Sequence, residues 1–197
     1  MTNDKLKIAV ADDERDMRDF FQKILTHLGY QVIIQAENGD ELVSQCREVT
    51  PDLIITDIEM PVMDGLTAVN LICKDRPIPA IVVTAHHDDQ HVQRALHEQI
   101  LAYLVKPIKM ADLQPAILLA MQRYKEFEAL HKQTVDLRQA LEDRKLIEKA
   151  KGILMSRTQM SEADAFRRLQ QLSNDKNVKM VEIAKMIVTA EEAFRLV

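Results

Sequence analysis

Five short runs of apolar, β-branched residues restrict the fold more than any other feature of this sequence. They predict strands, which occupy residues 7–11, 31–36, 53–57, 80–84 and 102–105. Amphipathic stretches between them predict helices at residues 15–28, 39–48, 64–74 and 88–98, and from residue 111 onward. Because strands that alternate with helices pair in parallel, the pattern predicts an α/β domain with a five-stranded parallel sheet covered on both faces.

Composition and charge indicate a folded protein with two different parts. The 197 residues are 47% hydrophobic and 29% charged, as in ordinary globular domains. Residues 1–125 carry a net charge of −6, whereas residues 143–197 carry +3, which suggests two roles. No apolar run reaches the roughly 18 residues of a membrane-spanning helix, and the N-terminus lacks the apolar core of a signal peptide. We therefore expect a cytoplasmic protein without membrane contact.

A long helix is predicted from about residue 113 to about residue 156, where helix-forming residues are almost uninterrupted. Apolar or small residues recur there at three- and four-residue steps, with Arg123 as an interruption: Leu113, Ala116, Ala120, Phe127, Leu130, Thr134, Leu137 and Leu141. This spacing is typical of a coiled-coil seam. The seam either pairs with a second chain or packs on the domains of its own chain.

Two further helices are predicted after the long one. Ser161 and Asp164 have the spacing of a capping box, which opens a helix that we expect to end near residue 172. The turn-rich residues 173–177 follow, and Asn177 is expected to cap a last helix over residues 178–194. Together with the end of the long helix, these segments predict a small three-helix, all-α unit.

Chemically distinctive side chains stand where the predicted strands end. Asp12 and Asp13 follow the first strand, Asp57 ends the third, Thr84 ends the fourth and Lys106 follows the fifth. Ligands of open parallel sheets bind beyond the carboxyl ends of the strands. If the first strand is central, these five side chains converge.

The converging residues suit phosphoryl transfer. Three carboxylates would repel one another unless they hold a hard cation, and oxygen ligands suit Mg²⁺. A lysine and a hydroxyl would stabilise the oxygens of a transferred phosphoryl group, and Asp57 is the best nucleophile because it lies deepest along its strand. One such aspartate alone would more often cap a helix or face solvent, so the prediction depends on the combination.

Residues 5–125 resemble the receiver domain of two-component response regulators. The matching pieces are Asp12-Asp13, "DIEMPVMDG" (57–65), Thr84-Ala85 and "AYLVKP" (102–107). The resemblance implies a flavodoxin-like fold and phosphorylation of Asp57 by a sensor histidine kinase in a phosphorelay. It also implies that the chain is not an enzyme, beyond slow self-dephosphorylation.

The resemblance also implies roles for single residues. Asp13, Asp57 and the backbone carbonyl of Glu59 would bind Mg²⁺ directly, and Asp12 would act mainly through water. Lys106 and Thr84 would contact the phosphoryl group, Tyr103 would be the aromatic switch, and the Lys106–Pro107 bond would be cis. One departure is that receivers usually have a glycine shortly before the last strand. Here residues 99–101, "QIL", occupy that expected turn.

The tail contains basic residues that could form a phosphate-binding face. The candidates are Lys149, Lys151, Arg157, Arg167, Arg168 and Lys179. Acids lie among them, so an ordinary solvated helix surface is an equal alternative. Aromatic side chains for base stacking are sparse.

Residues 147–188 are similar to the ANTAR domain of AmiR- and NasR-like antitermination regulators. The shared pieces are "AKG" (150–152), "LM" (154–155), "MSEADAFRRL" (160–169) and "EIAKMIV" (182–188). The resemblance implies a module that binds paired RNA hairpins in leader transcripts and dimerises through the preceding helix. Gly152 should permit a close helix–helix or helix–RNA approach, because a glycine inside a helix costs about 1 kcal/mol relative to alanine.

These observations predict a receiver domain at residues 1–122, a coiled-coil-like linker helix at 123–142 and an ANTAR RNA-binding domain at 143–197. The expected function is phosphorylation-controlled antitermination, with homodimer formation on phosphorylation pairing two tails. The alternative is a DNA-binding regulator with a helix-turn-helix-like tail. That motif often contains a glycine in its turn, which this tail lacks between its last two helices. A tail used only for dimerisation or docking is a third alternative.

Overall fold

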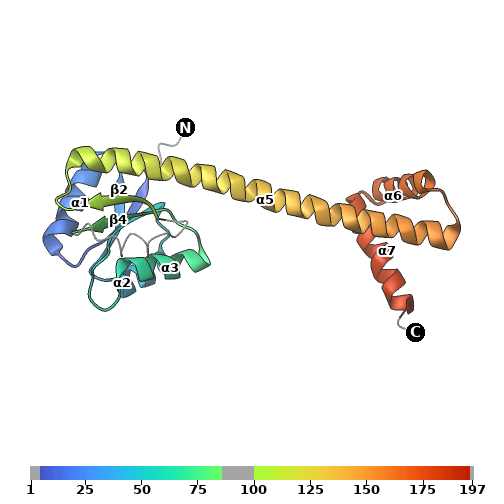
Figure 1. The fold of residues 1–197 in the computed structure, drawn as a ribbon, viewed down its shortest axis with the longest axis horizontal. Helices are drawn as coiled ribbons and strands as arrows, with labels where there is room; N and C mark the ends of the chain where they lie inside the picture. Colours follow the sequence, from blue (N-terminus) through green and yellow to red (C-terminus); the bar gives the residue numbers. More distant parts are fainter. Residues whose placement is uncertain (1–4, 86–99, 196–197) are drawn as a thin grey trace. The chain divides into compact units, whose positions relative to one another are not determined.

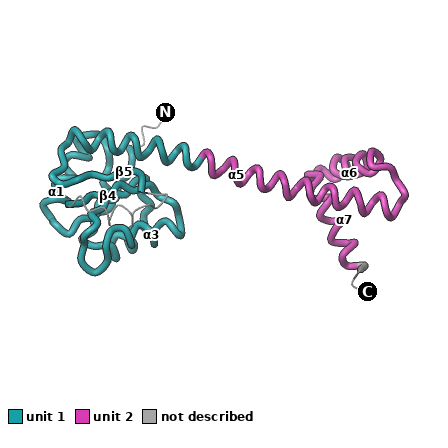
Figure 2. Tube along the Cα trace, viewed as in Figure 1, with its two compact units in different colours: residues 1–128 teal, residues 129–197 magenta. Residues whose placement is uncertain are grey.

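The computed structural model describes residues 5–85 and 100–195. The chain divides into two compact units, Met1–Glu128 and Ala129–Val197, which we call the N-terminal and C-terminal units (Figure 2). The helix predicted at residues 88–98 lies outside the described residues.

The N-terminal unit contains the predicted five-stranded parallel sheet. Its strands are β1 (Lys7–Ala11), β2 (Gln31–Ala36), β3 (Leu53–Asp57), β4 (Ala80–Thr84) and β5 (Ile100–Val105). Their order is β2-β1-β3-β4-β5, so β1 is interior, as the convergence argument requires. The first four strands have the predicted bounds. The turn expected at residues 99–101 is wrong for Ile100 and Leu101, because Ile100 already pairs with Ala80 in the sheet.

Helices cover both faces of this sheet (Figure 1). The described helices are α1 (Arg15–His27), α2 (Gly39–Glu48), α3 (Gly65–Asp75), α5 (Met110–Thr158), α6 (Glu162–Lys176) and α7 (Met180–Arg195). Side chains of each strand alternate between the two faces. Ile8 and Val10 enter the core beneath α1 and the start of α5, whereas Ala9 and Ala11 enter the core beneath α2 and α3.

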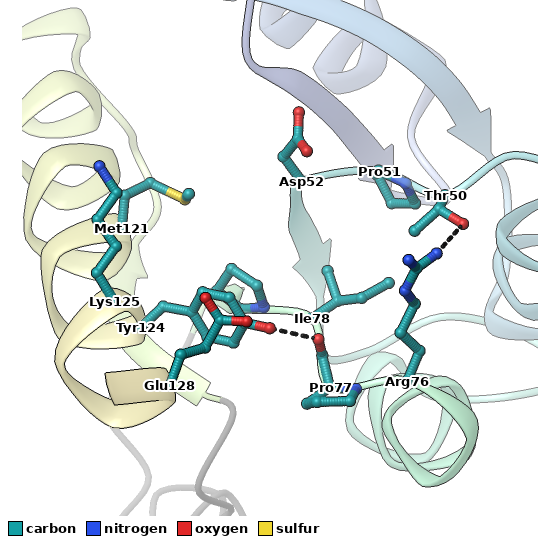
Figure 3. Close-up of a pocket in the computed structure, with 11 residues that line it drawn as sticks. Thr50, Pro51, Asp52, Arg76, Pro77, Ile78, Met121, Tyr124, Lys125 and Glu128 are labelled. Carbon is teal, nitrogen blue, oxygen red and sulfur yellow. Dashed lines mark hydrogen bonds between the residues drawn. The ribbon is translucent and has the colours of Figure 1, made fainter. Parts of the chain in front are cut away.

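The first part of α5 belongs to the N-terminal unit. Leu113 and Ala120 are fully buried in the core of the sheet, so this part of the predicted seam packs on its own domain. The Tyr124 hydroxyl donates a hydrogen bond of 2.7 Å to the Pro77 carbonyl, inside a pocket of about 340 Å³ (Figure 3). Further along the helix, Leu130 and Leu137 are 63% and 69% exposed.

The C-terminal unit packs the end of α5 against α6 and α7. Its core contains Ala150, Leu169, Ile183, Ala184 and Val188. Ser161 is the N-cap of α6, as predicted, because its side chain accepts a 3.2 Å hydrogen bond from the Asp164 backbone N–H, and its hydroxyl donates to Asp164 Oδ2 at 2.6 Å. No helix in the described ranges is long and apolar enough to cross a membrane.

The junction between α6 and α7 corrects the sequence prediction. Helix α6 runs to Lys176 rather than ending near residue 172, and α7 begins at Met180. Asn177 is the C-cap of α6, with φ at 52°, and not the N-cap of the last helix. Asparagine caps both kinds of helix end, because its short polar side chain also tolerates the left-handed conformation.

Candidate functional site

An acidic pocket lies at the carboxyl ends of the strands. Asp12 directly follows β1, Asp57 is the last residue of β3, and Asp13 comes next to Asp12. Side-chain oxygens of these three residues all lie within 4.8 Å of one another. The interior position of β1, beside β3, produces this convergence.

Two glycines hold the loop that follows Asp57. The Gly65 N–H donates to the Ile58 carbonyl and the Gly39 N–H donates to the Met63 carbonyl, each at 3.0 Å. A Cβ at Gly65 would lie 1.9 Å from the carbonyl oxygen of Asp57. Only glycine therefore allows α3 to begin this close to the end of β3. Within the loop, the Glu59 N–H donates to Asp57 Oδ1 at 3.2 Å.

Lys106 brings positive charge to the three carboxylates. Its Nζ donates a short hydrogen bond to Asp57 Oδ2 and lies 3.0 Å from Asp12 Oδ2. The Lys106–Pro107 bond is cis, as the receiver resemblance implied. Burial disfavours the charged ammonium, but the hydrogen bonds and charges of Asp57 and Asp12 outweigh that effect and raise the pKa of Lys106.

The pocket fits a divalent cation. The Asp12 side chain is fully buried, and this burial raises its pKa, while the Glu14 N–H and Lys106 act in the opposite direction. Asp13 is exposed at the mouth of the pocket. One ammonium cannot balance three carboxylates, so the pocket keeps an excess of negative charge made of oxygen donors. Hard cations such as Mg²⁺ prefer this donor set.

Thr84 lies on β4 and Tyr103 lies on β5, the two strands that follow β3 in the order of the sheet. Thr84 ends β4 and is half-buried, and its carbonyl accepts a 2.8 Å hydrogen bond from the Lys106 N–H. The half-buried ring of Tyr103, on β5, packs against the buried residues Ile58, Leu66 and Val82. The Tyr103 hydroxyl is buried and has no hydrogen-bond partner within the described ranges. The switch role of Tyr103 stays a prediction.

In the C-terminal unit, four of the six basic candidates form ion pairs with the unit's own acids. The pairs are Lys149–Glu192 at 2.7 Å, Lys151–Glu148 at 2.8 Å, Lys151–Glu162 at 2.7 Å, Arg157–Glu191 at 3.0 Å and Arg167–Asp164 at 2.9 Å. The Lys151 side chain is only 9% exposed and joins α5 to α6. Arg168 and Lys179 are exposed and form no ion pair with the residues that the structure describes.

Arg18 contacts the acidic loop, and the sequence prediction missed it. This arginine is buried in α1, and its guanidinium donates to the backbone carbonyls of Asp12 and Asp13. A signal for it existed. Arg18 occupies the helix face that also carries the buried residues Phe21 and Leu25, where the helical period predicts an apolar side chain.

Two protein families match this chain. Residues 8–118 match the response regulator receiver domain, and residues 135–188 match the ANTAR domain. The transcriptional regulatory protein PdtaR of Mycobacterium tuberculosis (strain H37Rv) is 37% identical over 182 residues, which cover 92% of this chain and 89% of that protein. The response regulator GacA of Pseudomonas syringae pv. syringae is 32% identical over 60% of this chain and 58% of its own length.

Solved receiver structures share the fold of the N-terminal unit. A receiver domain protein from Clostridium thermocellum matches with a TM-score of 0.56 and 31% identity, over 61% of this chain and 98% of its own. The CheX–CheY complex with BeF₃ and Mg²⁺ from Borrelia burgdorferi matches with a TM-score of 0.54 and 26% identity, over 57% of this chain and 87% of that one. The chain therefore belongs to the response regulators of two-component systems and joins a receiver domain to an RNA-binding ANTAR domain.

Proposed function

We propose that this protein is a phosphorylation-controlled regulator that carries a signal from a sensor histidine kinase to leader-RNA hairpins and acts by transcription antitermination. The observation that carries the proposal is the convergence of Asp12, Asp13, Asp57 and Lys106 in a chain that ends in an ANTAR domain. The first three provide a nucleophile and a cation site, and the lysine provides fixed charge. This constellation suits a phosphoryl acceptor.

The phosphoryl step uses Asp57 as the nucleophile. One of its carboxylate oxygens forms a bond to phosphorus while the phosphorus–nitrogen bond of the kinase's phosphohistidine breaks, and the electron pair returns to the imidazole. Both Asp57 oxygens are occupied by hydrogen bonds, from Glu59 N–H and from Lys106. If Oδ2 is the attacking oxygen, the ammonium leaves it and pairs with a phosphoryl oxygen, a short movement for a flexible side chain.

Asp13, Asp57 and the Glu59 carbonyl are the residues that would hold Mg²⁺, with Asp12 acting through water. The bound cation would neutralise charge on the phosphoryl oxygens. The donor set supports this assignment, and so does the related CheY complex, which contains BeF₃ and Mg²⁺. Thr84 would donate its hydroxyl to the phosphoryl group.

The signal would pass from the sheet to α5. Tyr103 lies on β5, and Val105 of the same strand pairs with Thr84, so a change at the phosphoryl group reaches β5 through one neighbouring strand. Leu113 and Ile117 of α5 belong to a core cluster that also contains Leu104 of β5. A shift of β5 would therefore change how the start of α5 packs.

Phosphorylation would then favour a homodimer. Leu130, Leu137 and Leu141 follow the predicted seam on α5 and are 63%, 69% and 56% exposed. Burying this row of leucines against a second copy of the chain gains hydrophobic free energy. In the dimer, once one tail has bound a hairpin, the second tail is held at a high effective concentration near a second hairpin of the same RNA. Sedimentation with and without BeF₃ and Mg²⁺ checks this. Unchanged mass at concentrations near the dissociation constant would contradict it.

Gly152 supports RNA contact at the tail. It is exposed on α5, and a Cβ built there meets nothing within 4 Å, so packing within this chain does not explain the glycine. It lines a groove of about 360 Å³ together with residues that include Lys149, Ile153 and Val188. A phosphate or base that approaches the bare helix backbone would use this space. Gly152→Ala should weaken RNA binding while it stabilises the helix.

The central experiment compares hairpin RNA with duplex DNA of matched length, at one stated salt concentration, using the full chain. Binding is measured by fluorescence anisotropy with and without BeF₃ and Mg²⁺. We expect preference for the RNA and tighter binding in the activated form. Preference for duplex DNA would favour the helix-turn-helix alternative, and no binding above a polyanion control would favour a docking tail.

Asp57→Asn separates the receiver from the tail. The variant should lose labelling by a small-molecule phosphodonor and lose the BeF₃ response, because the amide is not a nucleophile. Its basal RNA affinity should stay unchanged. Retained labelling would show that another residue accepts the phosphoryl group. Antitermination itself is checked with a reporter that carries a terminator between promoter and gene, in which the variant should give less readthrough.

A further inference from the structure

Arg18 links three segments of the N-terminal unit. The side chain is 9% exposed and starts from the buried face of α1. Its Nη1 donates to the backbone carbonyls of Asp12 and Asp13, at 2.8 and 3.0 Å. Its Nη2 donates to Glu37 Oε1 at 2.6 Å, directly after β2. One guanidinium thus joins α1, the loop after β1 and the loop after β2.

These contacts define how the acidic loop presents its carboxylates. With both carbonyls bound to the guanidinium, the peptide units of Asp12 and Asp13 have one orientation. The Asp12 carboxylate is held at its other end, because Oδ1 accepts a 3.0 Å hydrogen bond from the Glu14 N–H. Without Arg18, two carbonyls would lose their partner in a largely buried region, which is unfavourable unless the loop rearranges.

We propose that Arg18 is a positioning residue for the divalent cation site, acting through the backbone of Asp12 and Asp13. Arg18 would fix the separation of the Asp12 and Asp13 carboxylates before the cation binds. The loop that carries them would then lose less conformational freedom on binding. Its positive charge would also reduce the repulsion among the clustered acids. This inference rests on the proposed Mg²⁺ site and adds to it a residue that does not touch the cation.

Glu37 is the outer anchor of the arrangement. Its side chain is 66% exposed, so the ion pair with Arg18 contributes little stability by itself. It binds Nη2 of the guanidinium, whereas the carbonyls of the acidic loop bind Nη1. Removal of Glu37 should therefore weaken the cation site less than removal of Arg18.

The test measures the dissociation constant for Mg²⁺ directly, by calorimetric titration of the full chain with and without Arg18→Ala. We expect weakening of about 10-fold, the lower end of the range for residues that orient metal ligands. Lys23→Ala removes an exposed positive charge from the same helix and should leave the constant unchanged. Millimolar guanidinium should restore affinity in Arg18→Ala, and sodium at equal ionic strength should not.

The outcomes separate this inference from the proposed function. If the wild-type chain does not bind Mg²⁺, the proposed site fails. If the wild type binds and Arg18→Ala binds equally well when folded, the positioning role is overturned, as it is if guanidinium gives no rescue. Where circular dichroism shows Arg18→Ala to be unfolded, Arg18→Lys decides. It retains the charge but not the forked contacts, so we expect weaker Mg²⁺ binding than in the wild type, and equal binding would overturn the positioning role.

Discussion

The two units use charge in opposite ways. In the N-terminal unit two of the three clustered acids are buried: Asp12 is 0% and Asp57 6% exposed, and a single lysine faces both. In the C-terminal unit three of the six basic candidates are both exposed and paired with local acids, as Arg157 is with Glu191. Phosphoryl chemistry needs one fixed geometry, whereas RNA binding needs cations that can change partners.

The energetics of ion pairs explain this division. Each buried charge loses several kcal/mol of hydration free energy. A buried cluster is therefore stable only while every charge in it keeps its partner, because loss of one partner leaves an uncompensated buried charge. Exposed pairs contribute about 0–1 kcal/mol and are weakened by salt. The pair between Lys149 and Glu192, both more than half exposed, can therefore be exchanged for a pair with an RNA phosphate at small cost.

The largest expected effect separates two glycines, one in each unit. Gly65→Ala should destabilise the N-terminal unit by about 3 kcal/mol, because its Cβ would lie 1.9 Å from the Asp57 carbonyl oxygen and backbone must move. Gly152→Ala should instead stabilise the C-terminal unit by about 1 kcal/mol, because nothing lies within 4 Å. Urea unfolding measures both. Equal effects would contradict the difference in crowding between the two sites.

Asp12→Asn tests the buried acid. Burial raises the pKa of Asp12 above its ordinary value of 3.8, so ionisation opposes folding. This penalty is absent below the unfolded-state pKa, grows as pH rises and is complete above the folded-state pKa. At pH 7 without divalent cations, the variant should therefore unfold at a higher temperature than the wild type.

The same variant should lose stabilisation by Mg²⁺. At 100 times its dissociation constant, a bound cation adds about 2.7 kcal/mol to the wild type. Thermal unfolding with Mg²⁺ and with a chelator measures the gain, and Asp19→Asn, an exposed acid on α1, is the control. A full Mg²⁺ response in Asp12→Asn would contradict a role for this carboxylate in holding the cation.

Residues at strand ends could be predicted from sequence because each has a local signature. Asp57 interrupts an apolar run, and the parallel topology that follows from strand alternation brings it to the same edge as Asp12. Arg18 was missed because its partners are backbone carbonyls, which every residue offers, so no pair of side chains marks the contact. The position of Tyr124 beside Pro77 likewise depends on the path of α5, which local pattern does not determine.

In the C-terminal unit, residue type alone did not predict which basic side chains are exposed. Lys151 and Lys179 look alike in the sequence, yet Lys151 is 9% exposed between two glutamates and Lys179 is exposed. The difference arises from the packing of α6 on α5, since Glu162 opens α6 beside Lys151. Asn177 was assigned to the wrong helix because asparagine suits both helix ends.

Glu191→Gln with Glu192→Gln should strengthen RNA binding. The two glutamates hold Arg157 and Lys149 at 3.0 and 2.7 Å, and uncharged glutamine would leave these cations to RNA phosphates. We expect about tenfold tighter binding, equal to about 1.4 kcal/mol. The salt slope should steepen by about one for each cation released. Anisotropy titrations at several salt concentrations measure both quantities.

Glu182→Gln is a single-charge control, to be compared with half the effect of the double variant. Glu182 is also exposed on α7 and forms no ion pair with the described part of the chain, so it frees no cation. Its substitution should change affinity only through net charge. If all these variants improve binding equally per charge removed, then general charge rather than release of Lys149 and Arg157 is responsible.

The smallest effect concerns backbone conformation beside the phosphoryl site. Val62 has φ at 68° and is 88% exposed, and the Met63 N–H donates to the Pro61 carbonyl at 2.7 Å across it. This turn is strained for a β-branched residue, whose side chain crowds the backbone at positive φ. Asn177 in the C-terminal unit also has a positive φ, 52°, but asparagine tolerates that region.

Val62→Gly should therefore stabilise the N-terminal unit by about 1 kcal/mol, whereas Asn177→Gly should change stability by only a few tenths of a kcal/mol. Urea unfolding of both variants against the wild type measures the difference. Glycine also makes the unfolded chain more flexible, which opposes folding in both variants alike. A gain specific to Val62 thus reports strain at that position. Equal small losses in both variants would mean that the loop after Asp57 holds Val62 without strain, and that the two units do not differ in how they use positive-φ residues.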